Sequence, residues 1–476
     1  MNDSDTICAL ATAPGGALGI IRVSGHQSLE VLSHIFIKDL TQANPNTIHY
    51  GHIKHGTEII DEVMVSVFRA PHSYTGEDSA EISCHGSRYI LNKVLELLIQ
   101  QGCRMARPGE YTQRAYLNGK MDLSQAEAVA DLIASTNRAT HQIAMNQLRG
   151  GISSKLAQLR EQLLKLTSLL ELELDFSDHE DLEFADRSEL LELTKTIDNH
   201  ITHLANTFET GQALKQGIPV AIVGKTNVGK STLLNALLKE DRAIVSDIHG
   251  TTRDTIEDTI DINGITFRFI DTAGIRQTTD QIEQIGIART YAAIDKARIV
   301  LWLIDTEPTE SEIQEMQEHY KDKSLIVIYN KIDKQPDKKL NYPLSNIHYP
   351  ILPLSAKYGI GLDTLRQRLL DFAPKSADSD IIVSNARHYD ALCRAHSHLQ
   401  RVIGGMGAKM VNSPLGRRTL AIGGTQEWSM VNPPLSGDLL AEDLRLTLDT
   451  LAEITGGQIT PNEVLGNIFK HFCVGK

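Results

Sequence analysis

A glycine-rich segment at residues 224–231, GKTNVGKS, has the spacing GxxxxGK[ST] of a phosphate-binding loop. It follows the apolar run Pro219–Val223 and precedes a helix expected over Thr232–Leu238. Glycines let backbone N–H groups close around phosphate oxygens, while Lys230 reaches the β- and γ-phosphates and Ser231 offers a hydroxyl to Mg²⁺. The strand–loop–helix setting therefore predicts a nucleotide-binding P-loop.

Four further motifs follow in the order that GTPases use. The motif GTTRD at 250–254 lies in a polar stretch, and DTAG at 271–274 ends an apolar run. We expect Thr252 to cap Mg²⁺, Asp271 to hold its water shell, and the Gly274 amide to sense the γ-phosphate. NKID at 330–333 and SAK at 355–357 each follow a further apolar run.

The NKID motif selects the base. The Asp333 carboxylate can accept hydrogen bonds from guanine N1 and N2, whereas adenine has no such pair of donors. The chain is thus predicted to bind GTP rather than ATP. The residues expected at the nucleotide are Asn227, Val228, Gly229, Lys230, Ser231, Thr232, Ser246, Asp247, Ile248, His249, Gly250, Thr251, Thr252, Asp271, Thr272, Ala273, Gly274, Asn330, Lys331, Asp333, Ser355, Ala356 and Lys357.

Two positions set this site apart from the commonest small GTPases. Ile275 follows DTAG where those carry a glutamine that orients the attacking water. Glu283 is our candidate for that role, acting through a water; the alternative is an ordinary surface glutamate. The amide oxygen of Asn227 could coordinate a monovalent cation beside the phosphates; the alternative is a solvent-facing loop residue. With Lys230 and Thr252, Glu283 makes up the predicted hydrolytic set.

The motifs need a scaffold, which the pattern of apolar runs predicts. Between residue 218 and about 375, short apolar strands alternate with helices. This rhythm implies a parallel sheet with helices on both faces. The expected strands are Pro219–Val223, Ile265–Ile270, Ile299–Ile304, Leu325–Tyr329 and Ile351–Leu354.

Different patterns flank this unit. Residues 1 to about 120 mix short apolar runs with Gly and Pro, with one helical stretch at Tyr89–Ile99, which is typical of a small α+β domain. Leucines from Leu156 to Leu174 recur every three or four residues, and Leu440–Leu451 forms a second helical stripe. These flanks are either two helical domains or one discontinuous domain with the α/β unit inserted; the pattern fits both.

Composition excludes several classes of protein. The 476 residues carry 47 Lys and Arg against 60 Asp and Glu, a net charge of −13, which argues against a general polyanion binder. Five scattered cysteines with no CxxC pair exclude a disulfide framework or a cysteine zinc site and fit a reducing cytosol. We see neither a signal peptide nor an apolar stretch of about 18 residues, so we expect a cytoplasmic chain that does not cross a membrane.

Both ends of the chain, together with its centre, resemble the tRNA modification GTPases of the MnmE (TrmE) type. The resemblance rests on DTICALATAPGGALGIIRVSG at 5–25, APHSYTGEDSAEISCHGS at 70–87, RPGEYTQRAYLNGKMDLSQAEAVADLI at 107–133 and the terminal FCVGK. It implies an α+β folate-binding-like domain at 1–120 that mediates dimerisation and an inserted Ras-like P-loop domain at 218–378. It further implies one discontinuous helical domain made of residues 121–217 and 379–476.

The resemblance also implies cofactors. Arg22, Glu81, Lys120 and Lys476 match positions that hold a tetrahydrofolate derivative, in its 5,10-methylene or 5-formyl form. Asn227, Ser246, Ile248 and Thr251 match a potassium site, and Ser231 and Thr252 match the Mg²⁺ ligands. Cys473 lies in the terminal motif and is expected near the one-carbon chemistry; the alternative is a small buried apolar residue.

The implied reaction needs partners. A homodimer of this chain would join an FAD-containing protein, MnmG, in a heterotetramer and place a carboxymethylaminomethyl-type group on C5 of the tRNA wobble uridine, U34. A ribosome-assembly GTPase of the Era or EngA type and a folate-dependent aminomethyltransferase with a regulatory GTPase are the alternatives. The chain departs from the family in having Thr226 where the loop commonly has Pro, Val228 where it has a small residue, and a stretch at Gly404–Pro434 that is longer than the family core needs.

Overall fold

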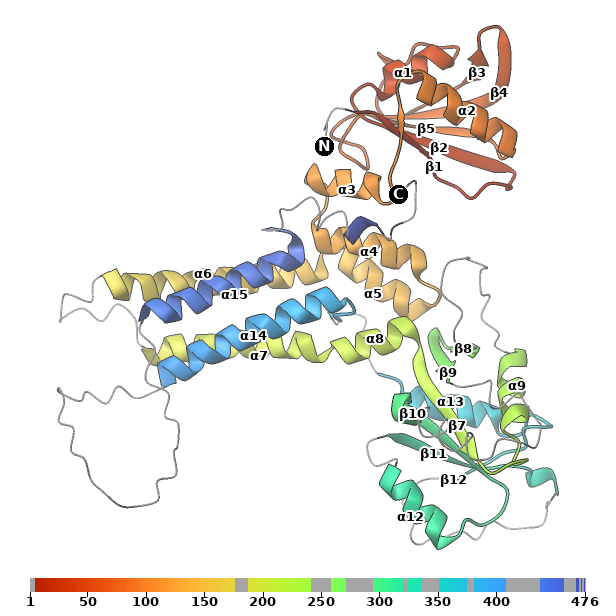
Figure 1. Cartoon of the computed structure of the whole chain (residues 1–476), viewed down its shortest axis with the longest axis vertical. Helices are drawn as coiled ribbons and strands as arrows, with labels where there is room; N and C mark the ends of the chain where they lie inside the picture. The colour runs from red at the N-terminus through yellow and green to blue at the C-terminus, as the bar shows by residue number, and fades with distance from the viewer. Residues whose placement is uncertain are drawn as a thin grey trace, which may run out of the picture. The chain divides into compact units, whose positions relative to one another are not determined.

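The computed structural model describes residues 5–175, 187–240, 258–270, 294–319, 323–334, 351–374, 381–407, 437–457, 468–470, 472 and 475. These fall into two compact units (Figure 1). The first comprises Met1–Ala134, Ala144–Thr202 and Asp390–Lys476, and the second comprises Ser135–Ile143 and His203–Tyr389.

The first unit begins with a six-stranded sheet in the order β3-β4-β5-β2-β1-β6. Along β4, Val63, Val65 and Val67 are buried while the residues between them are more exposed, the two-residue period of a strand with one covered face. The helices α1 (Ser28–Ile35) and α2 (Arg88–Gln100) supply the apolar cover. The strands are β1 (Ile7–Leu10), β2 (Leu18–Ser24), β3 (Thr47–His55), β4 (Glu58–Phe68), β5 (Ser79–His85) and β6 (Arg104–Met105).

A short helix, α3 (Glu110–Leu117), follows β6. The stretch from 104 to 120 is the most basic part of this region, yet two of its three arginines, Arg104 and Arg114, are paired with carboxylates. Arg104 contacts Asp5 at 2.7 Å and Glu110 at 2.6 Å, and Arg114 contacts Asp5 at 2.6 Å. The hydrogen bond from Arg104 lowers the pKa of Asp5. Because these cations are neutralised within the chain, they serve first to hold α3 against the N-terminal strand.

The helical part of the first unit draws on both flanks of the chain. Helix α15 packs along α6 (Figure 1), and the predicted leucine stripes are buried on both, as at Leu163 and Leu444. Asp198 accepts hydrogen bonds from His396 and Gln400, each at 2.7 Å, which ties α7 to α14. The prediction of one discontinuous helical domain is thereby confirmed. The helices with residues in the first unit are α4 (Leu123–Ala134), α5 (Arg138–Leu148), α6 (Gly151–Asp175), α7 (Arg187–Asn206), α14 (Ala386–Gly407) and α15 (Gly437–Thr455), whereas α8 (Phe208–Gln216) lies in the second unit.

The second unit is built on a sheet in the order β12-β11-β10-β7-β9-β8. Apolar residues of α9 and α13 cover one face, and those of α12 cover the other. The elements are β7 (Ile218–Gly224), α9 (Lys230–Glu240), β8 (Asp258–Ile262), β9 (Ile265–Phe269), β10 (Ile299–Ile304), α12 (Glu310–His319), β11 (Ser324–Tyr329), the 3₁₀ turn η1 (Ile332–Lys334), β12 (Ile351–Pro353) and α13 (Leu362–Phe372).

The five expected strands pair in parallel, but the sheet has a sixth strand at one edge that does not. β8, which the strand pattern did not predict, pairs antiparallel with β9. Asn263 and Gly264 both have positive φ, 51° and 82°, which suits the two-residue turn of a β-hairpin. The remaining pairs, β7–β9, β7–β10, β10–β11 and β11–β12, are parallel as expected.

Among the helices formed by the described residues, none combines the length and the apolar character that crossing a membrane requires.

Candidate functional site

The P-loop occupies the predicted place between β7 and α9. Gly224, Asn227 and Gly229 have φ values of 147°, 60° and 107°, conformations that suit Gly and, less often, Asn. A Cβ on Gly229 would lie 2.3 Å from the side-chain nitrogen of Asn330. The loop thus needs glycine both for its backbone shape and for its close approach to the NKID motif.

Lys230, the first residue of α9, reaches back over this loop. Its ammonium donates to the carbonyl oxygens of Gly224 at 2.5 Å and Lys225 at 2.9 Å. Burial lowers the pKa of Lys230, because the charged form is partly stripped of water. A poorly hydrated ammonium at the N-terminal end of a helix attracts phosphate strongly, which is the chemistry expected of this lysine.

The base-recognition motifs meet the loop at the carboxyl ends of β11 and β12. Asn330 is buried; its amide donates to the Val228 carbonyl at 2.8 Å and accepts from the Ala356 N–H at 3.0 Å. Lys331 donates to the Asn227 carbonyl at 2.6 Å. Three motifs that lie far apart in the sequence are therefore locked together through one asparagine and one lysine.

Asp333 and Ser355 complete the base end. The Ser355 hydroxyl donates to one Asp333 oxygen at 2.6 Å, which fixes the carboxylate. The held carboxylate is exposed, so it is accessible to a ligand. Its place within η1, just beyond the carboxyl end of β11, suits the acceptor role that guanine recognition requires. Lys357 lies over the ring of Tyr358, 5.0 Å from its centroid.

Two contacts of the site were not predicted from the sequence, one with the NKID motif and one with the P-loop. Asp305, directly after β10, accepts from Lys331 at 2.7 Å, and Glu312 on α12 pairs with Lys225 at 2.6 Å. Asp305 carries the signal used for the other motifs, a polar residue at the carboxyl end of a parallel strand. Glu312 is bonded by the Thr309 N–H at 2.9 Å, so Thr309–Glu312 is a helix capping box that the sequence displays.

Part of the predicted nucleotide site lies outside the described residues. This holds for Ser246, Asp247, Ile248, His249, Gly250, Thr251, Thr252, Asp271, Thr272, Ala273, Gly274 and Glu283. Among the residues that the structure does describe, no three His, Cys, Asp or Glu side chains gather as a metal site would require. Ser231 and Thr232 lie in the first turn of α9, next to the phosphate-binding loop.

The first unit holds a second polar cluster on neighbouring strands. Arg22 on β2 stands opposite Glu81 on β5, and its Nε and Nη2 both donate to one Glu81 oxygen, at 2.9 and 2.7 Å. The guanidinium lies 5.6 Å from the Tyr74 ring centroid and 5.5 Å from that of Tyr111. Two of the predicted folate residues are thus brought together, as a pair that neutralises its own charge.

The other two predicted folate residues differ in outcome. Lys120 donates to the Pro71 carbonyl at 2.8 Å, which places its ammonium against the loop that carries Tyr74. Among the described residues, no hydrogen bond or ion pair joins Lys120 to the Arg22–Glu81 pair. Lys476 and Cys473 lie outside the described residues, but their neighbour Gly475 accepts a hydrogen bond from Arg22 Nη1 at 3.2 Å. The chain's end therefore reaches the Arg22–Glu81 pair.

Comparison with known proteins covers the whole chain. A family model described as the N-terminus of the GTP-binding protein TrmE matches residues 6–120, and one described as the MnmE helical domain matches 123–473. A relative from Bacteroides thetaiotaomicron, named tRNA modification GTPase MnmE, is 51% identical over 491 residues and covers all of both chains. One of the same name from Flavobacterium johnsoniae is 48% identical over 493 residues, again covering both chains fully.

A solved structure, the G domain of the Thermotoga maritima FeoB iron transporter, is 24% identical with a TM-score of 0.25. It covers 33% of this chain and 99% of its own. That partial likeness is too weak to bear on function. The two family models and the relatives of matching length, taken with the assembled P-loop, NKID and SAK motifs, settle the assignment. The chain belongs to the MnmE family of tRNA modification GTPases.

Proposed function

We propose that this chain hydrolyses GTP to drive a tRNA modification in the cytoplasm. The reaction adds a carboxymethylaminomethyl-type group to C5 of the wobble uridine, U34, together with an FAD-containing partner of the MnmG type. Full-length relatives named as tRNA modification GTPases support the RNA substrate. The proposal that GTP is the nucleotide rests on the contacts among three motifs: Asn330 joins the P-loop to the SAK loop, and Ser355 holds the Asp333 carboxylate.

The hydrolytic roles follow from position. Lys230 would hold the β- and γ-phosphates, with Ser231 and Thr252 as ligands of Mg²⁺. Asp271 would support the metal's water shell, and Glu283 would orient the attacking water. The last three residues lie outside the described part of the chain, so their roles rest on the sequence motifs.

The Arg22–Glu81 cluster fits a reduced folate, which would supply the one-carbon unit. Among the described residues, no donor reaches the second oxygen of Glu81, so it can accept from pterin ring N–H groups. The rings of Tyr74 and Tyr111 give the cluster apolar walls, and Lys120 on the neighbouring loop suits the acidic tail of a folate. Lys476 and Cys473 are assigned to this site through their neighbour Gly475.

A potassium ion and a homodimer complete the proposal. Asn227 is held with φ of 60° beside the phosphate-binding glycines, where its side-chain oxygen could join Ser246, Ile248 and Thr251 around K⁺. A monovalent cation there would offset the charge that develops between the β- and γ-phosphates. Two such P-loop domains meeting across this region would keep water from the ion.

GTP hydrolysis is expected to be at least about tenfold faster in KCl than in NaCl, because a cation at Asn227 stabilises transition-state charge. Asn227→Ala should lose this difference. Asn263→Ala, at another positive-φ asparagine in the β8–β9 turn, should keep it. Phosphate release measured at equal ionic strength decides the matter, and equal rates in the two salts for the wild type would refute the potassium site.

A further inference from the structure

The chain's end is packed into the first unit at several points. Phe469 is 2% exposed and lies in an apolar cluster with Leu123 and Ala126 of α4. The rings of Phe469 and Phe472 lie 5.0 Å apart between centroids. Gly475 is also buried. We call the described residues Ile468, Phe469, Lys470, Phe472 and Gly475 the C-terminal strap.

One face of α3 receives this strap. Gly109 directly precedes α3, and Gln113 and Tyr116 follow it at spacings of four and three residues, so the three lie on one side of the helix. A Cβ on Gly109 would lie 2.8 Å from the Phe472 Cβ and 2.9 Å from the Phe469 carbonyl oxygen, so the strap's backbone approaches more closely than any side chain would allow.

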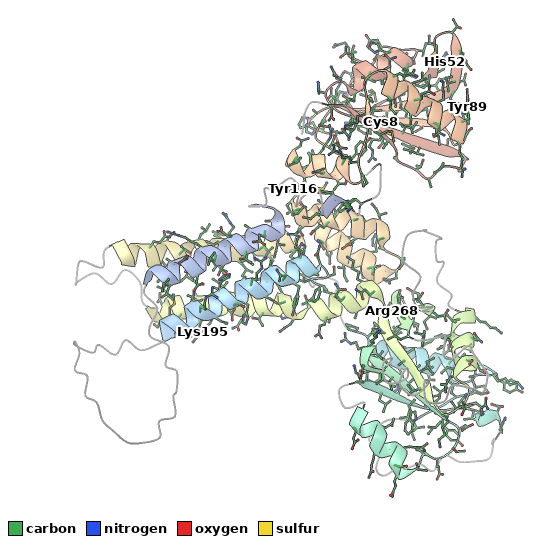
Figure 2. The ribbon with its side chains drawn as sticks, viewed as in Figure 1. Cys8, His52, Tyr89, Tyr116, Lys195 and Arg268 are labelled. Carbon is green, nitrogen blue, oxygen red and sulfur yellow. The ribbon has the colours of Figure 1, made fainter. Side chains whose placement is uncertain are left out.

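The same face of α3 also contacts the end of α15. The Tyr116 hydroxyl donates to the Gly456 carbonyl at 2.9 Å, and Figure 2 shows Tyr116 at the end of α3. Gln113 is 8% exposed, and its side-chain amide nitrogen has no hydrogen-bond partner among the described residues. This face of α3 thus offers an apolar surface on which the strap packs, and beside it the buried amide N–H₂ group of Gln113.

The far end of the strap meets the Arg22–Glu81 pair. A Cβ on Gly475, whose φ is 92°, would lie 2.4 Å from the Leu10 carbonyl oxygen at the end of β1. Arg22 Nη1 donates to the Gly475 carbonyl at 3.2 Å, while its other nitrogens bind Glu81. If the strap left, this guanidinium would lose one of the partners that fix its orientation.

We propose that α3 is the seat of the C-terminal strap and that Gly109 is a positioning residue for the Arg22–Glu81 site. By letting the strap seat, Gly109 fixes the Arg22 guanidinium and, through it, the Glu81 carboxylate that faces the ligand. The ligand, a reduced folate, rests on the proposed function. Because the strap follows α15 in the chain and Gly456, the residue after α15, bonds to Tyr116 of α3, the site's geometry is tied to the helical domain.

The test compares Gly109→Ala with Gly119→Ala in the full-length chain. The two glycines have φ values of 66° and 68°, so both substitutions cost similar backbone strain, but nothing lies within 4 Å of a Cβ at Gly119. Hydrogen exchange of the peptide that begins at Ile468 reports the seating, since the Phe472 N–H bonds the Phe469 carbonyl at 3.0 Å. Calorimetric titration with 5-formyltetrahydrofolate reports the site.

Gly109→Ala is expected to speed exchange of the strap and to weaken folate binding, each by about tenfold, while Gly119→Ala stays near wild type in both. Gly475→Ala displaces the strap from a position away from α3, so it should speed exchange and weaken folate binding as Gly109→Ala does. The same result from both variants would show that the effect does not come from misfolding of α3. Unchanged exchange in both Gly109→Ala and Gly475→Ala would overturn the proposal that the strap is seated on α3. Faster exchange with unchanged folate affinity would overturn the positioning role of Gly109. If the wild type binds no folate, the proposed ligand is wrong, and the exchange comparison alone then supports or overturns the seat.

Discussion

Asp333→Asn is expected to weaken GTP binding by about a hundredfold and to shift the site's preference to xanthosine triphosphate. The carboxylate is held by Ser355 at 2.6 Å and offers acceptors to guanine N1–H and N2–H. The amide of asparagine would instead present a donor to guanine's donors, which leaves polar groups unpaired. Xanthine carries a carbonyl oxygen at C2 and so accepts that donor.

Fluorescent-nucleotide titration of the wild type and Asp333→Asn with both triphosphates gives the measurement. Asp363→Asn is a suitable control, because that carboxylate is 98% exposed and lies on α13, and it removes the same charge. An Asp333→Asn chain with wild-type affinity for GTP would show that this carboxylate does not read the base.

Gly229→Ala is expected to reduce nucleotide binding by at least about a hundredfold and to destabilise the second unit by about 1–3 kcal/mol. The added Cβ would lie 2.3 Å from the Asn330 side-chain nitrogen. Asn330 would have to move, and with it the hydrogen bonds to Val228 and Ala356 that join loop and base site. The φ of 107° adds backbone strain.

Gly359→Ala separates strain from contact in this experiment. Gly359 has φ of 74°, and a Cβ there would meet only Leu362 at 3.8 Å. The thermal stability of the Gly359→Ala variant should fall modestly, while its affinity for GTP stays near that of the wild type. If Gly359→Ala lost as much nucleotide affinity as Gly229→Ala, the effect would belong to general strain and not to the contact with Asn330.

The described part of the nucleotide site could be predicted because the P-loop, the NKID motif and the SAK motif each follow a parallel strand. Strands that run parallel bring their carboxyl ends to one edge, so Gly224, Asn330 and Ser355 had to meet once the strands were recognised. The turn residues of the second unit would have allowed one further prediction. The Asn263-Gly264 pair is a strong hairpin signal and would have predicted the antiparallel β8–β9 edge that the alternation rule did not predict.

The Arg22 cluster could not be derived in the same way. Arg22 and Glu81 pair through strand register, and Arg22 and Gly475 are 453 residues apart. Neither relation leaves a period or a short motif in the sequence, so only the resemblance to a family pointed to these residues. That resemblance gave Arg22 to an acidic ligand, whereas in the folded chain its first partner is Glu81.

Nucleoside mass spectrometry of tRNA is the most direct test of the proposal that GTP hydrolysis by this chain drives modification of the wobble uridine. Cells lacking the gene would be rescued with the wild type, with Lys230→Ala, which removes the ammonium at the phosphate loop, or with the surface variant Lys195→Ala on α7. We expect the C5-modified wobble uridine to disappear when the gene is lost, to return with the wild type and Lys195→Ala, and to stay absent with Lys230→Ala at equal protein levels. Wobble uridines that are unchanged in every strain would contradict it and favour a GTPase switch in ribosome assembly.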